Sequence, residues 1–205
     1  MLFRRHTLET RIVVLPPALA SQIAAGEVVE RPSSAVKELI ENALDAGAQR
    51  VDVEIEGGGV TRLSVSDDGV GMSAENARLS VERHATSKLT AISDLNNLAS
   101  YGFRGEALPS IASVSRFTLR SRPANEDAGV EVLIEGVAEP VVREAGMAVG
   151  TRVEVRELFF NIPARRKFLR STGTESGHVT EVVEAADAHG LVEQLVTDDH
   201  VRIMP

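Results

Sequence analysis

Residues 32–47 read PSSAVKELIENALDAG, and this stretch predicts the helix around which the rest of the chain is organised. Its apolar side chains recur at positions i, i+3, i+4, i+7 and i+8, a spacing typical of an amphipathic helix with one buried face. These side chains are Val36, Leu39, Ile40, Ala43 and Leu44. Because proline is tolerated in a first helical turn and glycine often follows the last turn, we expect the helix to begin near Pro32 and to end near Gly47.

A polar row runs along the same helix, opposite the apolar stripe. Glu38, Asn42 and Asp45 stand at i, i+4 and i+7, so two carboxylates and a carboxamide share one face. On most amphipathic helices such a row is simply a solvated face. A functional role for it therefore depends on other segments that could lie close to it.

Two glycine-containing segments are candidates for that position. Residues 66–72 read SDDGVGM, an acidic turn whose glycines are spaced for close approach of the backbone. Residues 102–108 read GFRGEAL, a glycine-bracketed loop that leads into a helix. Such a loop presents backbone N–H groups to a phosphate.

The segments after the first helix alternate in the manner of strands. Residues 51–56 alternate apolar with acidic side chains, glycines at 57–59 form a turn, and a second strand over residues 60–66 leads into Asp67. We expect this hairpin to place Asp67 at the edge of a sheet against which the first helix packs.

The rest of the chain continues this mixture of helices and hairpins. Further strands are expected at residues 116–122, 130–134, 140–143 and 151–156. Further helices are expected at residues 17–25 with a terminator at Gly26, from a cap at Ser73 toward Arg83, at 106–112 and at 175–188. The pattern predicts a two-layer α/β sandwich with a mixed, mostly antiparallel sheet.

Composition limits the classes of function. The chain has 205 residues, no cysteine and a net charge of −8, so cysteine-based metal and redox chemistry is excluded and bulk electrostatic binding of nucleic acid is disfavoured. No run of 18 apolar residues is present, and we expect a cytoplasmic protein that does not enter a membrane. A local basic stretch could still contact DNA, although a solvated helix start is the alternative interpretation; its members are Arg165, Arg166, Lys167 and Arg170.

Several long motifs, in one order and spacing, resemble the GHKL superfamily of ATPases and, within it, the MutL family of DNA mismatch repair proteins. Besides the segments above, the motifs are LPP at 15–17, QIAAGEVVERP at 22–32, HATSK at 84–88 and NIPARRKFL at 161–169. An isolated Asp-x-Gly-x-Gly would be weak support, whereas this combination is specific. The resemblance implies the Bergerat (GHKL) ATP-binding fold, ATPase activity, and ATP and Mg²⁺ as cofactors.

The resemblance also assigns roles to three residues. Glu38 matches the family's general base, which orients and deprotonates the attacking water, and Asn42 matches the asparagine that holds Mg²⁺ beside the triphosphate. Asp67 matches the aspartate that accepts a hydrogen bond from the adenine amine. Since an ionised carboxylate only accepts, this position favours adenine over guanine. Asp68 follows it where many family members carry asparagine.

Further nucleotide contacts are implied for the residues around these three. They are Asp45, Ala46, Gly69, Gly71, Met72, Thr86, Ser87, Lys88, Gly102, Phe103, Arg104, Gly105, Glu106, Ala107, Leu108 and Thr151. The two groups at 86–88 and 102–108 resemble the lid that closes over the phosphates in this family.

The expected organisation is an N-terminal leader or arm at residues 1–13, a GHKL ATPase domain at 14–190 and a divergent segment at 191–205. The family's second subdomain, which supplies a lysine to the γ-phosphate, and its C-terminal dimerisation domain are not recognised in this sequence. The resemblance implies a slow ATPase switch in which ATP orders the lid and the arm and two ATPase domains associate. The implied partners are a MutS-like mismatch sensor, a downstream nuclease or helicase, and DNA. A non-catalytic interaction module that keeps the fold is the alternative.

Overall fold

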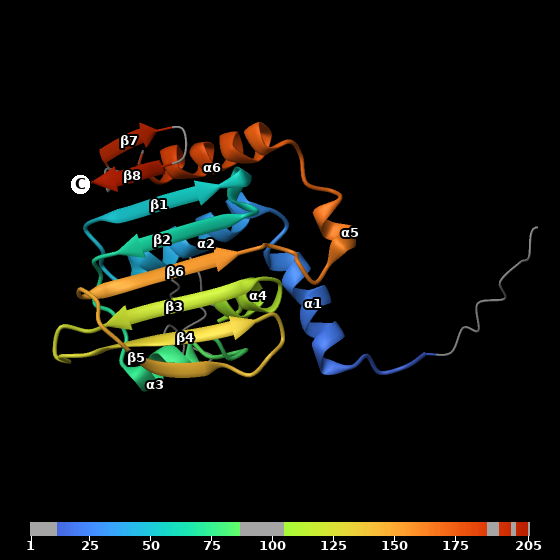
Figure 1. Ribbon diagram of the computed structural model, residues 1–205, viewed down its shortest axis with the longest axis horizontal. Coiled ribbons are helices and arrows are strands. Elements are labelled where there is room, and N and C mark those ends of the chain that lie inside the picture. Colours follow the sequence, from blue (N-terminus) through green and yellow to red (C-terminus); the bar gives the residue numbers. More distant parts are fainter. Residues whose placement is uncertain (1–11, 87–104, 188–192, 198–199, 205) are drawn as a thin grey trace, which may run out of the picture.

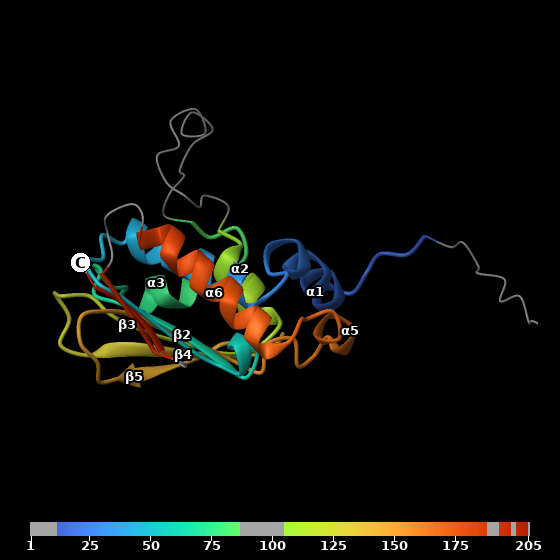
Figure 2. The same ribbon diagram turned by 90° about the horizontal axis from the view of Figure 1, so that it is seen from above.

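The computed structural model describes residues 12–86, 105–187, 193–197 and 200–204. Its helices cover one face of a twisted sheet and leave the other face open (Figure 1 and Figure 2). The helices are α1 (Pro17–Val28), α2 (Pro32–Asp45), the short 3-10 turn η1 (Gly57–Gly59), α3 (Ala74–Leu79), α4 (Ala107–Ser113), α5 (Pro163–Arg166) and α6 (Thr172–Asp187). The strands are β1 (Val51–Glu56), β2 (Arg62–Asp67), β3 (Arg116–Arg122), β4 (Gly129–Glu135), β5 (Val141–Ala145), β6 (Gly150–Arg156), β7 (Glu193–Thr197) and β8 (His200–Met204).

The sheet runs in the order β5-β4-β3-β6-β2-β1-β8-β7. Every pairing between these described strands is antiparallel. The two-layer α/β sandwich with a mostly antiparallel sheet is confirmed (Figure 2), whereas the parallel pairing that a mixed sheet requires is not found among the described strands. The expectation that Asp67 lies at the edge of the sheet is wrong, because β6 pairs with β2 on the side away from β1. Asp67 lies instead at the end of an interior strand.

The core lies between the sheet and α2, as the periodicities predict. In β1, Val51, Val53 and Ile55 are buried and the acidic residues between them are not. The apolar stripe of α2 is also buried, except for Leu44, which is partly exposed. Each apolar side chain removed from water contributes on the order of 1.5–3 kcal/mol, so this shared core holds α2 against β1 and β2.

Two helix ends differ from the sequence expectation. Helix α1 continues past Gly26 to Val28, so the predicted glycine terminator is wrong. Helix α3 begins after a Ser73 cap as predicted, with the Ser73 hydroxyl accepting from the N–H of Asn76 at 3.3 Å, but it ends at Leu79.

The segment after residue 190 contributes a hairpin that the sequence did not suggest. Strand β8 pairs with β1, and β7 pairs with β8. The predicted boundary between the ATPase domain and the C-terminal segment, at residue 190, stays a prediction. Within the described part of the chain, no helix is both long enough and apolar enough to cross a membrane.

Candidate functional site

The Asp67 carboxylate lies at the end of β2, where the sheet meets the turn that follows. Its Oδ1 accepts hydrogen bonds from the N–H of Gly69 at 2.9 Å and from the N–H of Thr151, its cross-strand neighbour in β6, at 3.3 Å. Burial raises the pKa of the Asp67 carboxyl, and the two backbone hydrogen bonds only partly oppose this. Both bonds use Oδ1, so they do not engage the second carboxylate oxygen, Oδ2.

Thr151, whose backbone N–H donates to this carboxylate, also contacts a second hydroxyl group in the sheet through its side chain. The Thr151 and Ser121 hydroxyl oxygens lie 2.9 Å apart, and the Ser121 hydroxyl donates to the carbonyl of Gly150 at 3.1 Å. The N–H of Met72 in turn donates to the Ser121 hydroxyl at 2.8 Å. These contacts connect the turn at residues 69–72 to β3 and, through Thr151, to β6.

Glycines let the backbone close tightly around Asp67. A Cβ atom on Gly69 would lie 2.9 Å from the Cβ of Ala46, and one on Gly150 would lie 2.0 Å from the Asp67 carbonyl oxygen. Gly71 has a φ of 69° and lies against the carbonyl of Arg122. The glycine spacing of the sequence therefore reflects close packing, as predicted.

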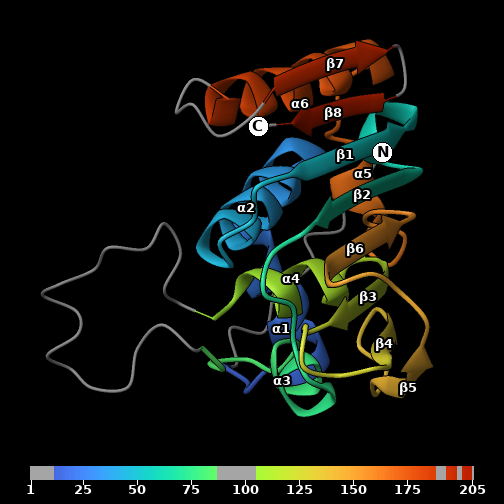
Figure 3. The same cartoon turned by 90° about the vertical axis from the view of Figure 1, so that its left-hand side faces the viewer.

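Helix α2 meets this turn at its C-terminal end. The N–H of Val70 donates to the carbonyl of Ala46 at 3.1 Å, directly after the last residue of the helix. Glu38 and Asn42 are half-buried on α2, while Asp45 is exposed. With a rise of about 1.5 Å per residue, Asn42 lies roughly 6 Å and Glu38 roughly 12 Å along the helix axis from Ala46. Figure 3 shows α2 lying beside β1 and β2.

Asp68 has a structural role that the sequence did not indicate. Its Oδ1 accepts from the N–H groups of both Gln49 and Arg50, each at 2.8 Å. The Asp68 carboxylate therefore fixes the connection between α2 and β1. An asparagine carbonyl oxygen could accept the same two bonds, which explains why either residue type fits this position.

Only part of the predicted lid can be placed. Ser87, Lys88, Gly102, Phe103 and Arg104 lie outside the described residues. Thr86, Ala107 and Leu108 are half-buried.

Gly105 and Glu106 lie directly against the residues before the predicted lid. Gly105 has a φ of 62° and packs against the carbonyl of Ala85. The Glu106 carboxylate accepts from Arg83 at 3.1 Å and lies 2.8 Å from Nδ1 of His84. Glu106, predicted to contact the nucleotide, thus joins residues 83–84 to the start of α4.

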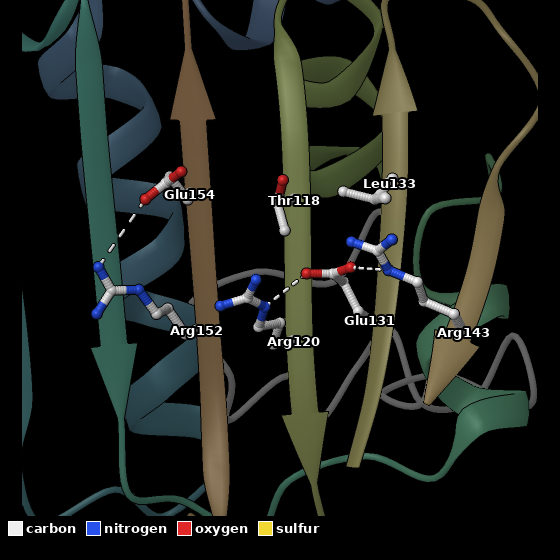
Figure 4. A pocket seen from close by; sticks show the side chains of 7 residues that line it. All are labelled: Thr118, Arg120, Glu131, Leu133, Arg143, Arg152 and Glu154. Atoms are coloured by element: carbon white, nitrogen blue, oxygen red, sulfur yellow. Dashed lines mark hydrogen bonds and ion pairs between the residues drawn. The ribbon is translucent and has the colours of Figure 1, made fainter. Parts of the chain in front are cut away.

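The two hollows described on the surface lie away from Asp67 and α2. One is formed by α3, α4 and the β4–β5 connection. The other lies on the open face of the sheet, where Glu131 of β4 is buried between Arg120 at 2.6 Å and Arg143 (Figure 4). Burial acts to raise the pKa of Glu131, but the hydrogen bonds from Arg143 and Arg120 outweigh it and hold the pKa below its usual value. The hollow on the open face is therefore lined by charged side chains that already pair with one another.

The basic stretch at 165–170 is divided by the structure. Arg165 is half-buried and donates from Nη1 to the carbonyl of Val29 at 3.0 Å. Arg166, Lys167 and Arg170 are exposed. A contact with DNA would therefore use these three and not Arg165.

The sequence and the fold both match known ATPases. Residues 30–141 match the family described as histidine kinase-, DNA gyrase B-, and HSP90-like ATPase. The DNA mismatch repair protein MutL of Opitutus terrae is 52% identical over 193 residues, which cover 93% of this chain and 31% of that protein. MutL of Geobacter sulfurreducens is 58% identical over 173 residues, covering 84% of this chain and 28% of that protein. The chain therefore spans less than a third of the length of these relatives.

Solved structures agree with this match. The Aquifex aeolicus MutL ATPase domain complexed with ADP superposes with a TM-score of 0.65 at 38% identity, over 86% of this chain and 65% of that chain. The same domain with a K252N mutation gives a TM-score of 0.62 at 38% identity, over 78% of this chain and 53% of that one.

Proposed function

The chain belongs to the histidine kinase-, DNA gyrase B- and HSP90-like ATPase family, in its MutL branch, and we propose that it binds Mg-ATP and hydrolyses it slowly as the switch of a DNA mismatch repair protein. The observation that carries this proposal is the contact between the Asp67 turn and the Ala46 end of α2. This contact supports the proposal because it places the turn that carries the adenine acceptor next to the end of the helix that carries Asn42 and Glu38.

The Asp67 end has the chemistry that adenine requires. Its half-buried carboxylate is held by backbone N–H groups through Oδ1, which leaves Oδ2 to accept from the adenine amine. The raised pKa of Asp67 reflects a desolvated acceptor, and a ligand donor would restore a hydrogen bond there. Guanine presents a carbonyl where adenine presents its amine, so we expect discrimination against GTP.

The α2 row has the chemistry that the phosphates require. The carboxamide oxygen of Asn42 is a hard ligand suited to Mg²⁺, which binds mainly through water and phosphate oxygens. When bound there, Mg²⁺ would neutralise charge on the phosphate oxygens. Glu38 lies one turn further from Ala46, and its half-buried carboxylate is suited to orient a water molecule and take its proton.

The switch would act through the segment between Thr86 and Gly105. Its two ends are already joined, through Glu106 with Arg83 and His84 and through Gly105 with Ala85. We propose that Mg-ATP orders this segment over the phosphates, together with the N-terminal arm, and that two such domains then associate. In the full-length protein this change would couple a MutS-like mismatch sensor to a downstream nuclease or helicase.

Binding and turnover of Mg-ATP by the purified chain test this proposal. Removing the base in Glu38→Ala is expected to leave ATP binding within about threefold and to lower turnover by about 10²–10⁴-fold. Lys37→Ala is the matched control, because Lys37 is exposed on the same helix and forms only a long ion pair with Glu41 at 3.8 Å. Turnover that survives in Glu38→Ala would contradict the role of Glu38.

A non-catalytic interaction module is the second candidate. Such a module would keep the fold and show weak or no binding of Mg-ATP. Isothermal titration calorimetry of the wild-type chain with ATP and Mg²⁺ separates the two, since only the ATPase proposal predicts saturable binding that depends on Asp67.

A further inference from the structure

Arg165 extends from α5 to the end of a helix that lies far away in the sequence. Its Nη1 donates to the carbonyl of Val29, the residue that caps the C-terminus of α1. Its guanidinium carbon lies 5.9 Å from the ring centre of Phe159, which is fully buried. Figures 1 and 2 both place α5 beside α1. The guanidinium is therefore held between a buried ring and a helix end.

Gly26 supplies the space that this guanidinium occupies. A Cβ atom on Gly26 would lie 1.3 Å from Nη2 of Arg165. Gly26 lies inside α1, where glycine costs about 1 kcal/mol relative to alanine. The space that the Arg165 guanidinium requires explains why this helical position holds a glycine.

The end of α1 also needs the charge that Arg165 brings. The last turn of a helix presents carbonyl groups without helical partners and a partial negative charge. Helix α1 has no basic residue in its own last turn. Arg165 supplies a cation from another element, and its fork of N–H groups suits a carbonyl acceptor.

This contact lies next to the helix that carries the proposed catalytic base. Val29 is buried, and only Glu30 and Arg31 separate it from Pro32, where α2 begins. Helix α1 packs against α4, and α2 also contacts α4. The α1–α2 elbow, residues 29–31, therefore connects the end of α1 directly to the start of α2, whose later turns pack on the sheet.

We propose that Arg165 is a positioning residue for turnover. Its guanidinium packs against Gly26 and binds the end of α1, which fixes the α1–α2 elbow and thereby the position of Glu38. This inference rests on the proposed ATPase function. It also removes Arg165 from the residues available to DNA. Because the Asp67 end is built from β2, β3 and β6, nucleotide binding is expected to depend little on Arg165.

The Gly26→Ala and Arg165→Ala variants, alone and together, test whether Arg165 holds the end of α1. Alanine favours the helix at residue 26, yet its Cβ would displace the flexible guanidinium. Both single variants are expected to speed hydrogen exchange of the amides of Val29, Ser34 and Ala35 by about tenfold or more, and the double variant is expected to add little, because all three lose the same contact. Arg166→Ala, which changes an exposed neighbour, is the control and is expected to leave exchange unchanged.

Steady-state kinetics test the positioning role. In both single variants we expect kcat to fall by about tenfold or more, with KM for ATP changed by less than about twofold, since misplacing a catalytic group lowers the rate of the chemical step. Unchanged exchange, additive effects in the double variant, an equal effect of Arg166→Ala, or an unchanged kcat would each overturn the proposal. A wild-type chain without ATP turnover would instead contradict the proposed function. The hydrogen-exchange comparison of the single and double variants needs no nucleotide, so it would still decide whether Arg165 holds the end of α1.

Discussion

Two carboxylates on opposite faces of the same sheet, Glu131 fully buried and Asp67 half-buried, are held in opposite ways. Glu131, on the open face, lies between two arginines, and its pKa is lowered although burial acts against this. Asp67, on the helix-covered face, accepts from two backbone N–H groups, and its pKa is raised by burial. Strand alternation places both residues, but only Glu131 has arginine partners that compensate its charge.

The difference separates a structural carboxylate from a candidate functional one. When a buried carboxylate is paired with cations, the protein itself offsets the cost of removing its charge from water. A carboxylate whose charge is only partly compensated can still accept a hydrogen bond from a ligand. The site proposed here therefore lies at the uncompensated carboxylate, although a hollow on the open face is lined by Glu131 (Figure 4).

The largest expected effect concerns how closely β6 approaches Asp67. Gly150 has a φ of 122°, and a Cβ there would lie 2.0 Å from the Asp67 carbonyl oxygen. Gly150→Ala is expected to lower the free energy of unfolding by about 3 kcal/mol or more, through backbone strain and overlap with rigid main chain. Urea denaturation measures this. Gly146→Ala is the control, because a Cβ on Gly146 would meet no atom within 4 Å, and an equal loss there would contradict the close-approach explanation.

Replacing the uncompensated carboxylate is expected to separate binding from stability. In Asp67→Asn the Oδ1 acceptor for Gly69 and Thr151 can remain, while the second position becomes a donor facing the adenine amine. We expect ATP affinity to fall about 100-fold, which is about 2.7 kcal/mol, and stability at pH 7 to be unchanged or higher. Calorimetric titration and urea denaturation measure the two quantities.

Asp68→Asn is the matched control for that substitution, because it keeps an acceptor for the N–H groups of Gln49 and Arg50. It is expected to change neither affinity nor stability by more than about 0.5 kcal/mol. A loss of stability in Asp67→Asn that matches its loss of affinity would show that Asp67 is structural, like Glu131.

Replacing the compensated carboxylate is expected to affect stability alone. Glu131→Gln removes the charge between Arg120 and Arg143, which are partly exposed and can be solvated again. We expect the free energy of unfolding to fall by about 1–2 kcal/mol with ATP binding unchanged. Glu135→Gln in the same strand, which breaks an exposed pair with Arg116, is expected to cost less than about 1 kcal/mol. Reduced ATP affinity in Glu131→Gln would place a ligand role on the open face.

The smallest expected effect is a difference in pH dependence between the two carboxylates. The folded-state pKa of Asp67 is raised above the unfolded-state pKa near 3.8, so at pH values between the two the folded state binds more protons than the unfolded state. The contribution of this residue to stability therefore falls as the pH rises through its folded-state pKa. Because the folded-state pKa of Glu131 is lowered, its contribution is present above about 4.5 and is lost as the pH falls through its folded pKa. Urea denaturation of the wild type, Asp67→Asn and Glu131→Gln between pH 3 and 7 should show slopes that differ from the wild type in opposite directions, and equal slopes would contradict the assignment.

Local periodicity predicted most of the fold. The apolar stripe of α2 and the alternation of β1 are signals within about a dozen residues, and both elements form where they were expected. Contacts over long sequence separations explain the failures. The glycine inside α1 lies where the Arg165 guanidinium occupies the space of a Cβ, and Asp67 lies in an interior strand because β6 pairs beside β2.

The candidate site was only partly readable from the sequence for the same reason. The helical spacing puts Glu38 and Asn42 on one face, and the glycines of residues 69–71 indicate close backbone approach. Nothing local, however, indicates that the Ser121 hydroxyl joins Met72 to Thr151, or that Asp68 fixes the chain at Gln49.

The most direct test of the account is a crystal structure of this chain with Mg²⁺ and a non-hydrolysable ATP analogue. We expect the adenine amine within hydrogen-bond distance of the Asp67 carboxylate, and the metal and phosphates along α2 beside Asn42 and Glu38. A nucleotide bound on the open face beside Glu131, or one whose base lies away from Asp67, would contradict it.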